Sequence, residues 1–342
     1  MSSTTPSFND LAQIMRSALK GELQNVLQVA REHGAQEMHE MLSYQLGWTG
    51  ENAGPRAQGK QIRPLLTLLT AQASGGVWQN ALPAAAAVEL VHNFSLIHDD
   101  IEDDSSLRRG RPTVWKKWGI PQAINTGDAM LTLANQAALR LEETTSLPIT
   151  LQASKILHHT CLRLTQGQHL DMGYETLPKV TVEEYWQMVE GKTASLIAAS
   201  CELGALCAKV SKEIQSHYRE FGFKLGLAFQ AQDDLLGIWG KTEISGKSNT
   251  GDLITRKKTL PILYGLTKNK AFAKRWKAGP FTAEEIPVIA KLLEGEGALG
   301  YTQKAADKLT SQALTALKQG NPQGEAGKAL HELAHKLLGR KG

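Results

Sequence analysis

The sequence predicts an all-α protein, and three observations support that prediction. Apolar residues recur at spacings of three and four, which is the period of a helix with one buried face. Alanine, leucine and glutamine are abundant, and no segment of useful strand length alternates apolar with polar residues. Prolines from Pro112 to Pro287 punctuate the helical segments. One seam of the helical kind consists of Leu90, Phe94, Ile97 and Ile101.

Length and composition indicate one large domain over residues 1–342, with N-terminal helices in 1–50 and a C-terminal helical cap in 280–342. The chain has 342 residues, of which 42% are hydrophobic, so it can bury a sizeable core. No linker rich in Gly, Ser and Pro divides it. The segments Thr181–Glu184 and Thr282–Glu285 each match a capping box, and we expect each to open a helix.

Charge and cysteine usage exclude several classes of function. A net charge of +4 does not call for nucleic acid as a partner. Cys161, Cys201 and Cys207 form no CxxC pair, which favours reduced cysteines in the cytoplasm. The first residues lack the pattern of a signal peptide. No apolar run reaches the ~18 residues of a membrane span, so we expect a soluble protein without stable membrane insertion.

The segment "HDDIEDDSSLRRG", residues 98–110, concentrates acidic residues directly after an apolar run. If residues 88–104 are helical, Asp99 and Asp103 lie one turn apart, about 40° from each other around the axis. Two carboxylates on one face suit a hard cation such as magnesium. A charged surface helix is the more common outcome for such a motif on its own.

A second acidic pair occurs in "FQAQDDLLG", residues 229–237. Gly222, Gly226, Gln230, Asp233 and Gly237 fall on one stripe of the expected helix. Because glycine in a helix costs roughly 1 kcal/mol relative to alanine, the stripe indicates either room for a ligand or close helix packing. Two such helices with acids facing one gap would hold several divalent cations, and a diphosphate is the natural anion to complete that cluster.

Basic residues occur in clusters that suit such an anion. Arg108 and Arg109 follow the first acidic segment in an expected loop, and the planar fork of arginine binds phosphate oxygens in a bidentate manner. Lys60 and Arg63 lie about one helical turn apart, and Lys192 precedes Thr193. A single cluster of this kind is more often a solvated surface charge. The remaining basic candidates are Lys247, Lys257 and Lys258.

Taken together, these motifs resemble the trans-isoprenyl diphosphate synthase family, which includes farnesyl and geranylgeranyl diphosphate synthases. The resemblance runs from about Gly59 to Pro261 and implies an all-α bundle around a deep central cavity, usually as a homodimer. The motif DDxxDxxxxRRG is met by Asp99, Asp100, Asp103, Arg108, Arg109 and Gly110. GKxxRP is met by Gly59, Lys60, Arg63 and Pro64, GQxxD by Gly167, Gln168 and Asp171, and the KT pair by Lys192 and Thr193.

The resemblance also implies roles for single residues. Two magnesium ions would bind through Asp99 and Asp103, and a third chiefly through Asp233. The family's second motif is usually DDxxD, and Gly237 stands at its fifth position, which puts the affinity of the third metal in question. Isopentenyl diphosphate would be bound by Lys60, Arg63, His92 and Arg109. The allylic diphosphate would be bound by Arg108, Lys192, Lys247 and Lys257, with Thr193 and Gln230 facing the reacting carbon.

The reaction implied is prenyl transfer by ionisation, condensation and elimination, giving an all-trans prenyl diphosphate. In the family, bulk at the fourth and fifth residues before the first aspartate limits product length. Here these are Ser95, which is small, and Phe94, which is large, and the combination resembles geranylgeranyl diphosphate synthases, with Phe94 as the cavity floor and a C20 product. On the helical wheel Ser95 lies on the stripe of Asp99 and Phe94 on the packing seam, so Phe94 fits a core residue equally well. The alternatives are a C15 or a longer product. A class I terpene cyclase and a non-catalytic subunit of a heteromeric synthase are further readings, from other functional classes.

Overall fold

The computed structural model describes residues 7–240 and 251–339. Over those residues the chain is helical except for one two-stranded ribbon, which confirms the all-α prediction. The chain divides into two compact units. Unit 1 comprises residues 1–161, 199–216 and 320–330, and unit 2 comprises residues 162–198, 217–319 and 331–342. None of the helices in the described ranges is both long and apolar enough to cross a membrane.

Unit 1 begins with the elements between Phe8 and Thr144. In chain order its elements are α1 (Phe8–Gln28), η1 (Val29–Gly34), α2 (Gln36–Gln45), α3 (Pro55–Gln58), α4 (Ile62–Ala73), η2 (Trp78–Ala81), α5 (Leu82–Glu102), β1 (Leu107–Arg108), β2 (Arg111–Pro112), α6 (Val114–Trp118), α7 (Ile120–Leu139) and α8 (Leu141–Thr144). The unit also takes residues from α9 (Leu147–Thr176), α11 (Ser195–Cys207), α12 (Lys212–Trp239) and α19 (Gly324–Leu338).

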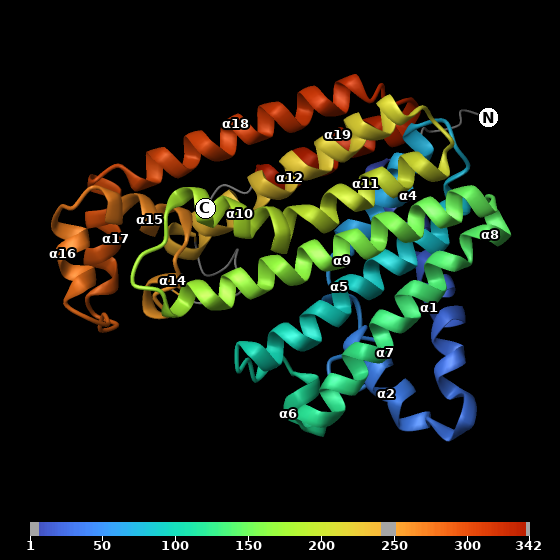
Figure 1. Ribbon diagram of the computed structural model, residues 1–342, viewed down its shortest axis with the longest axis horizontal. Helices are drawn as coiled ribbons and strands as arrows, with labels where there is room; N and C mark the ends of the chain where they lie inside the picture. The colour runs from blue at the N-terminus through green and yellow to red at the C-terminus, as the bar shows by residue number, and fades with distance from the viewer. Residues whose placement is uncertain (1–6, 241–250, 340–342) are drawn as a thin grey trace. The chain divides into compact units, whose positions relative to one another are not determined.

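Helix α5 is the central element of unit 1 and runs alongside α7 (Figure 1). Pro83 lies in its first turn, where the missing N–H costs nothing, and a run of alanines after it is fully buried. Close packing against α7 depends on Gly127, because a Cβ there would lie 2.2 Å from Nε2 of His98. The acidic residues Asp99, Asp100 and Glu102 lie at the C-terminal end of α5.

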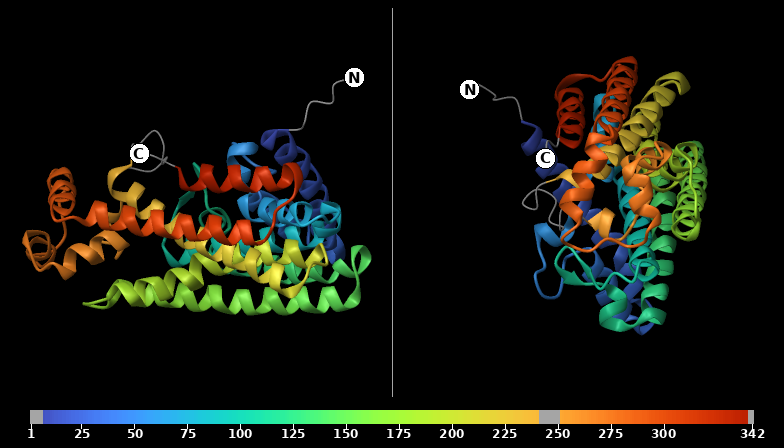
Figure 2. Two further views of the ribbon diagram at one scale, coloured as in Figure 1. Left: turned by 90° about the horizontal axis from the view of Figure 1, so that it is seen from above. Right: turned by 90° about the vertical axis from the view of Figure 1, so that its left-hand side faces the viewer.

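Most elements of unit 2 come from the C-terminal half of the chain. Its own elements are α10 (Val182–Val189), η3 (Glu190–Ala194), α14 (Gly251–Ile254), α15 (Leu260–Thr267), α16 (Ala271–Lys277), α17 (Ile286–Gly295) and α18 (Ala298–Gln319). One core cluster includes Tyr185, Ala194, Leu227 and Leu260, and a second joins α15, α16 and α17 around Phe272. The orange helices α16 and α17 lie next to each other in Figure 2.

The two expected capping boxes have different outcomes. At Thr181 the box is present, with the Thr181 N–H donating to Glu184 and the Glu184 N–H donating to the Thr181 hydroxyl at 3.2 Å, and it opens α10. The prediction for Thr282 is wrong in part. Its N–H does donate to Glu285 at 2.9 Å, but Glu285 is also bonded to Arg275, and helix α17 begins only at Ile286. That the whole chain is a single domain stays a prediction.

Candidate active site

The first acidic segment ends a helix instead of continuing one. Helix α5 stops at Glu102, so the expectation of a helix through residue 104 is wrong at its last two positions. Asp103 is the C-cap, and its N–H donates to the carbonyl of Asp99 at 2.9 Å. Asp104 then adopts a left-handed conformation with φ of 48°, which aspartate tolerates better than most residues. Asp99 and Asp103 therefore still lie one turn apart, as the sequence predicts.

The expected loop after α5 is a tight β-hairpin. Leu107–Arg108 pairs antiparallel with Arg111–Pro112. The two turn residues, Arg109 and Gly110, both have positive φ, at 53° and 76°, as a type I′ turn requires. The ribbon folds Arg108 back beside the end of α5.

Arg108 pairs with the second aspartate of the motif. Its Nε donates to Oδ1 of Asp100 at 2.8 Å, and its Nη2 lies 3.2 Å from Oδ2 of Asp99. Asp100 is only 2% exposed, and burial raises the pKa of its carboxyl although Arg108 opposes that shift. Burial also opposes the charge of Arg108, but the hydrogen bond to Asp100 and the nearby carboxylates raise its pKa overall. Asp100 thus anchors Arg108, while Asp99 lies partly exposed beside it.

Arg109 joins the GKxxRP segment. Its Nη1 donates to the carbonyl of Ala57 at 2.7 Å. Gly59 has a φ of 73°, and a Cβ there would lie 2.5 Å from Cζ of Arg109. This glycine is therefore needed both for its backbone conformation and for the space that the guanidinium group fills.

Two further predicted residues meet in the same unit. Nη1 of Arg63, in the first turn of α4, lies 3.4 Å from Nε2 of His92 on α5. Burial, followed by Arg63 and Arg109, lowers the pKa of His92 well below its ordinary value, so the ring is neutral at pH 7. Lys60 precedes α4 with an exposed side chain, and its carbonyl accepts from Arg16 at 3.1 Å. Unit 1 thus brings together Arg63, His92 and Arg109, and Lys60 lies in the segment that leads into α4.

In unit 2, Asp171 is shared by two lysines. Nζ of Lys192 donates to Oδ2 of Asp171, and Nζ of Lys257 lies 3.5 Å from the same oxygen. Burial alone would raise the pKa of Asp171, but Lys257 and Lys192 hold it below its ordinary value. Gly167 permits this arrangement, because a Cβ there would lie 2.0 Å from the backbone nitrogen of Lys192. The GQxxD segment therefore positions the KT segment.

The second acidic pair is held by a chain of neutral hydrogen bonds. The hydroxyl of Thr193 donates to Gln230 at 3.0 Å, and Nε2 of Gln230 donates to Oδ1 of Asp234 at 2.9 Å. The hydroxyl of Tyr185 and the N–H of Leu260 donate to Oδ2 of Asp234. Burial raises the pKa of Asp234 to about 7. Asp233, its neighbour in sequence, is half-buried and is the acid that the sequence assigns to a metal.

The glycine stripe of α12 serves close packing at two positions. A Cβ at Gly226 would lie 2.6 Å from Cα of Ala194, so this glycine lets α12 approach η3. A Cβ at Gly237 would lie 2.1 Å from Oδ2 of Asp252. The side-chain space at the fifth position of the second motif is therefore filled by a carboxylate from a separate segment. Lys247, the other basic candidate before Asp252, lies outside the described residues.

Several residues of these sites were not found by sequence reasoning. Glu89 lies inside α5 near Arg63 and Arg109, and its signal in the sequence is a lone carboxyl within an apolar run. Tyr185 and Asp252 give no local signal, since their partners lie far away in the chain. Within residues 7–240 and 251–339, no three His, Cys, Asp or Glu side chains are placed to enclose a metal ion by themselves.

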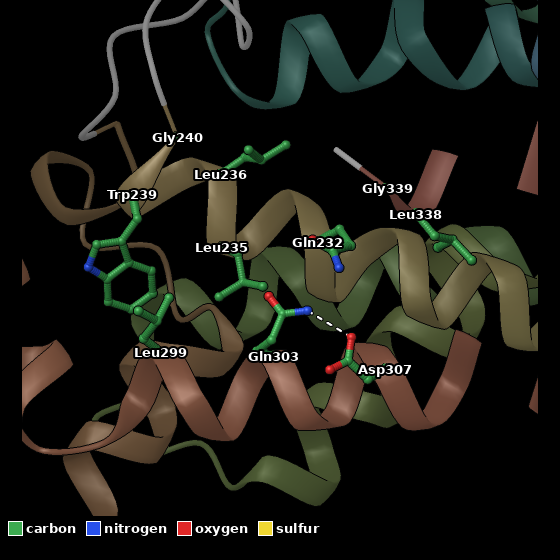
Figure 3. A pocket seen from close by; sticks show the side chains of 10 residues that line it. All are labelled: Gln232, Leu235, Leu236, Trp239, Gly240, Leu299, Gln303, Asp307, Leu338 and Gly339. Carbon is green, nitrogen blue, oxygen red and sulfur yellow. Dashed lines mark hydrogen bonds between the residues drawn. The ribbon is translucent and has the colours of Figure 1, made fainter. Parts of the chain in front are cut away.

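A separate pocket lies in unit 2 between α12, α18 and α19 (Figure 3). Its volume is about 390 Å³, and Leu235, Trp239 and Leu299 line it. At its polar side Nε2 of Gln303 donates to Oδ1 of Asp307 at 2.8 Å. None of the predicted active-site residues that the structure describes lines this pocket.

These features together define an all-α isoprenoid synthase fold. A family model described as polyprenyl synthetase matches residues 52–286, a range that includes every motif named above. The chain belongs to the polyprenyl synthetase family, as the resemblance of its motifs predicts, and it is a trans-prenyltransferase.

Individual relatives agree with that assignment. The chain is 38% identical over 315 residues to the (2E,6E)-farnesyl diphosphate synthase of Mycobacterium tuberculosis, which covers 89% of this chain and 86% of that protein. It is 37% identical over 315 residues to the geranylgeranyl diphosphate synthase of the same species, covering 90% and 89%. The crystal structure of a polyprenyl synthetase from Streptomyces coelicolor A3(2) has a TM-score of 0.86 at 33% identity, covering 97% of this chain and all of that one.

Proposed function

We propose that this chain condenses isopentenyl diphosphate with an allylic diphosphate to give an all-trans C20 prenyl diphosphate. The C–O bond of the allylic diphosphate breaks, which leaves an allylic cation and free diphosphate. The double bond of isopentenyl diphosphate attacks the cation to form a C–C bond. A proton is then lost, with the departing diphosphate as its acceptor. The observation that supports this proposal most is the cluster of two cations, Arg63 and Arg109, with the neutral ring of His92 in unit 1.

That cluster suits the diphosphate of the isopentenyl substrate. Arg63 and Arg109 offer planar donors that bind phosphate oxygens in pairs. His92 is neutral, and Nε2 faces Arg63, so its Nδ1 carries the proton and can donate to an anion. Lys60 adds an exposed ammonium group at the rim. The terpene cyclase alternative has no isopentenyl diphosphate to hold, so it leaves these four residues without a role.

In unit 2, the lysine pair suits the allylic diphosphate. Asp171 holds Lys192 and Lys257 to one oxygen, so both ammonium groups are oriented before a ligand arrives. Thr193 and Gln230 are fixed by their mutual hydrogen bond and by Asp234. Their oxygens can face a developing carbocation.

The remaining residue assigned to the allylic diphosphate, Arg108, belongs to unit 1. It keeps 29% of its side chain exposed while it pairs with Asp100, so it can still donate to an anion.

The acidic residues fit magnesium by the chemistry of their donors. Asp99 and Asp103 present carboxylate oxygens one helical turn apart, and hard cations of this kind prefer oxygen ligands. Because no protein cage encloses a metal among the described residues, the diphosphate oxygens would complete the coordination. In the second acidic segment, the carboxylate of Asp252 occupies the space at Gly237, and we propose that it supports the metal site of Asp233. Bound magnesium would neutralise the charge that develops on the leaving diphosphate.

The proposed C20 product length depends on Phe94 and Ser95. Phe94 is 7% exposed and packs edge to face on His98, with ring centroids 5.7 Å apart, while Ser95 is half-buried and bonds the carbonyl of His92. The relatives in Mycobacterium tuberculosis include both a C15 and a C20 synthase by name. Ser95→Phe should shorten the product towards C15, and Phe94→Ala should lengthen it. Chromatography of the dephosphorylated products measures both. Unchanged length with lower stability in Phe94→Ala would make that ring a core residue only.

One assay tests the activity itself. The purified chain is incubated with magnesium, isopentenyl diphosphate and an allylic primer, and the products are sized. A longer prenyl diphosphate is expected. Cyclic hydrocarbons from the primer alone would indicate a terpene cyclase, and no product without a second protein would indicate a subunit of a heteromeric synthase. We also propose that the chain acts in the cytoplasm as a homodimer, which light scattering would test.

A further inference from the structure

Glu89 is a buried carboxyl that the proposed reaction does not use. It lies in the middle of α5, is 2% exposed and is surrounded by an apolar helix face. Nδ2 of Asn93 donates to its Oε1 at 3.0 Å and to its backbone carbonyl at 2.9 Å. The other carboxyl oxygen, Oε2, is buried and has no hydrogen-bond partner among the described residues. A carboxylate buried in this way costs free energy unless cations nearby compensate it.

The cations that act on Glu89 come from two other elements. They are Arg63 at the start of α4 and Arg109 in the turn of the hairpin. Burial raises the pKa of Glu89 to about 7, and these two arginines limit the rise. In return, Glu89 is the carboxylate that most favours the charge of Arg109. His92, which lies between Glu89 and the acidic end of α5, is neutral and adds no charge.

Arg63 and Arg109 are also the arginines that the proposed function assigns to isopentenyl diphosphate. A diphosphate that binds both guanidinium groups brings more than one negative charge to the same cluster. Arginine cannot lose its proton to restore the balance. Of Glu89, Arg63 and Arg109, Glu89 is the group that can change its charge, because a carboxylate that loses its compensating cations in a dry site becomes easier to protonate. His92 can also take up a proton beside an anion, and the difference between wild type and Glu89→Gln separates the two groups.

We propose that Glu89 is an exchangeable counter-ion: its carboxylate neutralises Arg63 and Arg109 in the free enzyme and takes up a proton when a diphosphate binds them. The proton comes from solvent, and no covalent bond other than the O–H bond is formed. The inference rests on the proposed function only in naming isopentenyl diphosphate as the anion. It makes Glu89 a positioning residue, since it acts on the substrate through the arginines.

The proposal gives proton uptake a defined pH dependence. With the pKa of Glu89 at about 7, the fraction of free enzyme in which this carboxyl is ionised is about 0.9 at pH 8 and about 0.1 at pH 6. Uptake on binding is therefore close to one proton at pH 8 and close to none at pH 6. Linkage also requires that binding weakens as pH rises through this range, by about tenfold per unit above the pKa.

Calorimetric titration of the full chain tests this inference. Isopentenyl diphosphate alone serves as the first probe, because it cannot condense without an allylic partner, and inorganic pyrophosphate serves as the second. Buffers with different heats of ionisation report the protons exchanged at pH 6 and at pH 8. Glu89→Gln keeps the acceptor for Asn93 but removes the charge. Glu213→Gln, exposed at the start of α12, is the matched control.

At pH 8 the wild type should take up about 0.9 proton more than Glu89→Gln, and at pH 6 the two should agree. Glu89→Gln should also bind the probes up to about tenfold more tightly than wild type at pH 8, whereas a merely structural residue would weaken binding when replaced. Equal proton uptake in the two proteins at pH 8 would overturn the proposal. If the wild type does not condense its substrates, but the difference in proton uptake between wild type and Glu89→Gln is retained with pyrophosphate, the proposed function is overturned instead.

A second measurement needs no variant. Infrared difference spectra of the wild type, recorded with and without pyrophosphate at pH 8, should gain the carbonyl band of a protonated carboxylic acid. Absence of that band would contradict the proposal even if Glu89→Gln failed to fold.

Discussion

The two aspartate pairs, Asp99–Asp100 in unit 1 and Asp233–Asp234 in unit 2, have the same sequence and the same division of labour. In each pair the second aspartate is only 2% exposed and fixes the local structure, while the first lies partly exposed. The difference is in what holds the buried member. Asp100 is held by a cation, Arg108, whereas Asp234 is held by neutral donors, among them Tyr185.

This difference has a physical consequence. Beside a guanidinium group the cost of burying a carboxylate is partly offset, so Arg108 limits the rise in the pKa of Asp100 that burial causes. A buried carboxyl among neutral donors is easier to protonate, and the pKa of Asp234 accordingly rises to about 7. The unit 1 pair therefore combines a structural anchor with a charged group for substrate, and the unit 2 pair anchors the oxygens of Gln230 and Thr193 without adding a cation.

The largest expected effect is on the exposed member of the first pair. Asp99→Ala should lower turnover by at least ~100-fold, as is typical when one electrostatic stabiliser of a transition state is lost. Excess chelator should abolish turnover in the wild type. Steady-state kinetics with magnesium titration measure both, and Asp104→Asn, which suits the left-handed backbone there, is the control. Near-normal turnover of Asp99→Ala would contradict the metal-binding role of the first arm.

The next effect separates the two units by substrate. Arg63→Ala should raise the Michaelis constant for isopentenyl diphosphate by about 30-fold, which corresponds to the ~2 kcal/mol at the low end for a partly buried charge pair. Lys192→Ala should instead act mainly on the allylic substrate. Initial rates with each substrate varied in turn decide this. If either variant shifts both constants equally, the assignment of that diphosphate pocket is wrong.

Stability should respond to pH through Asp234. Its pKa is about 7 in the folded protein and about 3.9 when unfolded, so the folded state binds more protons between these values. The free energy of unfolding should therefore fall as pH rises through that window, by up to ~1.4 kcal/mol per pH unit. Asp234→Asn should remove this contribution and leave the similar one of Glu89, whose pKa is also raised to about 7, as urea unfolding at pH 5 and pH 6 would measure.

Asp100→Asn supplies the contrast. It should lower stability at both pH values, because it leaves the guanidinium group of Arg108 without its buried anion. The same pH slope in wild type and Asp234→Asn would show that Asp234 is already ionised in the folded protein.

The smallest effect concerns the departure at Gly237. Gly237→Ala would place a Cβ 2.1 Å from Oδ2 of Asp252, so that carboxylate must move. The magnesium concentration for half-maximal activity should rise by at most about tenfold, the low end for a group that supports a metal site. Gly173→Ala, where a Cβ meets nothing within 4 Å, is the matched control and should change nothing. Equal behaviour of the two variants would exclude a metal-supporting role for Asp252.

Sequence reasoning found the features that are local. The helical period gave the fold class, the capping box at Thr181 gave the start of α10, and the spacing of Asp99 and Asp103 gave their shared turn. It missed the hairpin, because a turn of Arg109 and Gly110 flanked by two-residue strands has no alternating pattern to detect.

It also missed features that depend on distant partners. The two members of an Asp-Asp pair look alike in sequence, and only the hydrogen bond from Tyr185, 49 residues away, distinguishes Asp234. The carboxylate beside Gly237 belongs to Asp252, and nothing in the sequence indicates that these two residues lie close together. Burial and long-range pairing decide such cases, and neither is encoded in spacing.

The hairpin has a consequence for how this protein can vary in evolution. Its turn separates two adjacent arginines that look interchangeable, since Arg108 bonds the acidic end of α5 and Arg109 bonds the carbonyl of Ala57. Arg108 ends a strand and Arg109 begins the turn, so adding or deleting one residue would move both arginines away from their partners. The length of this segment is thus constrained as well as its residues. Insertions that lengthen other surface loops harmlessly would here uncouple the aspartate motif from the GKxxRP segment.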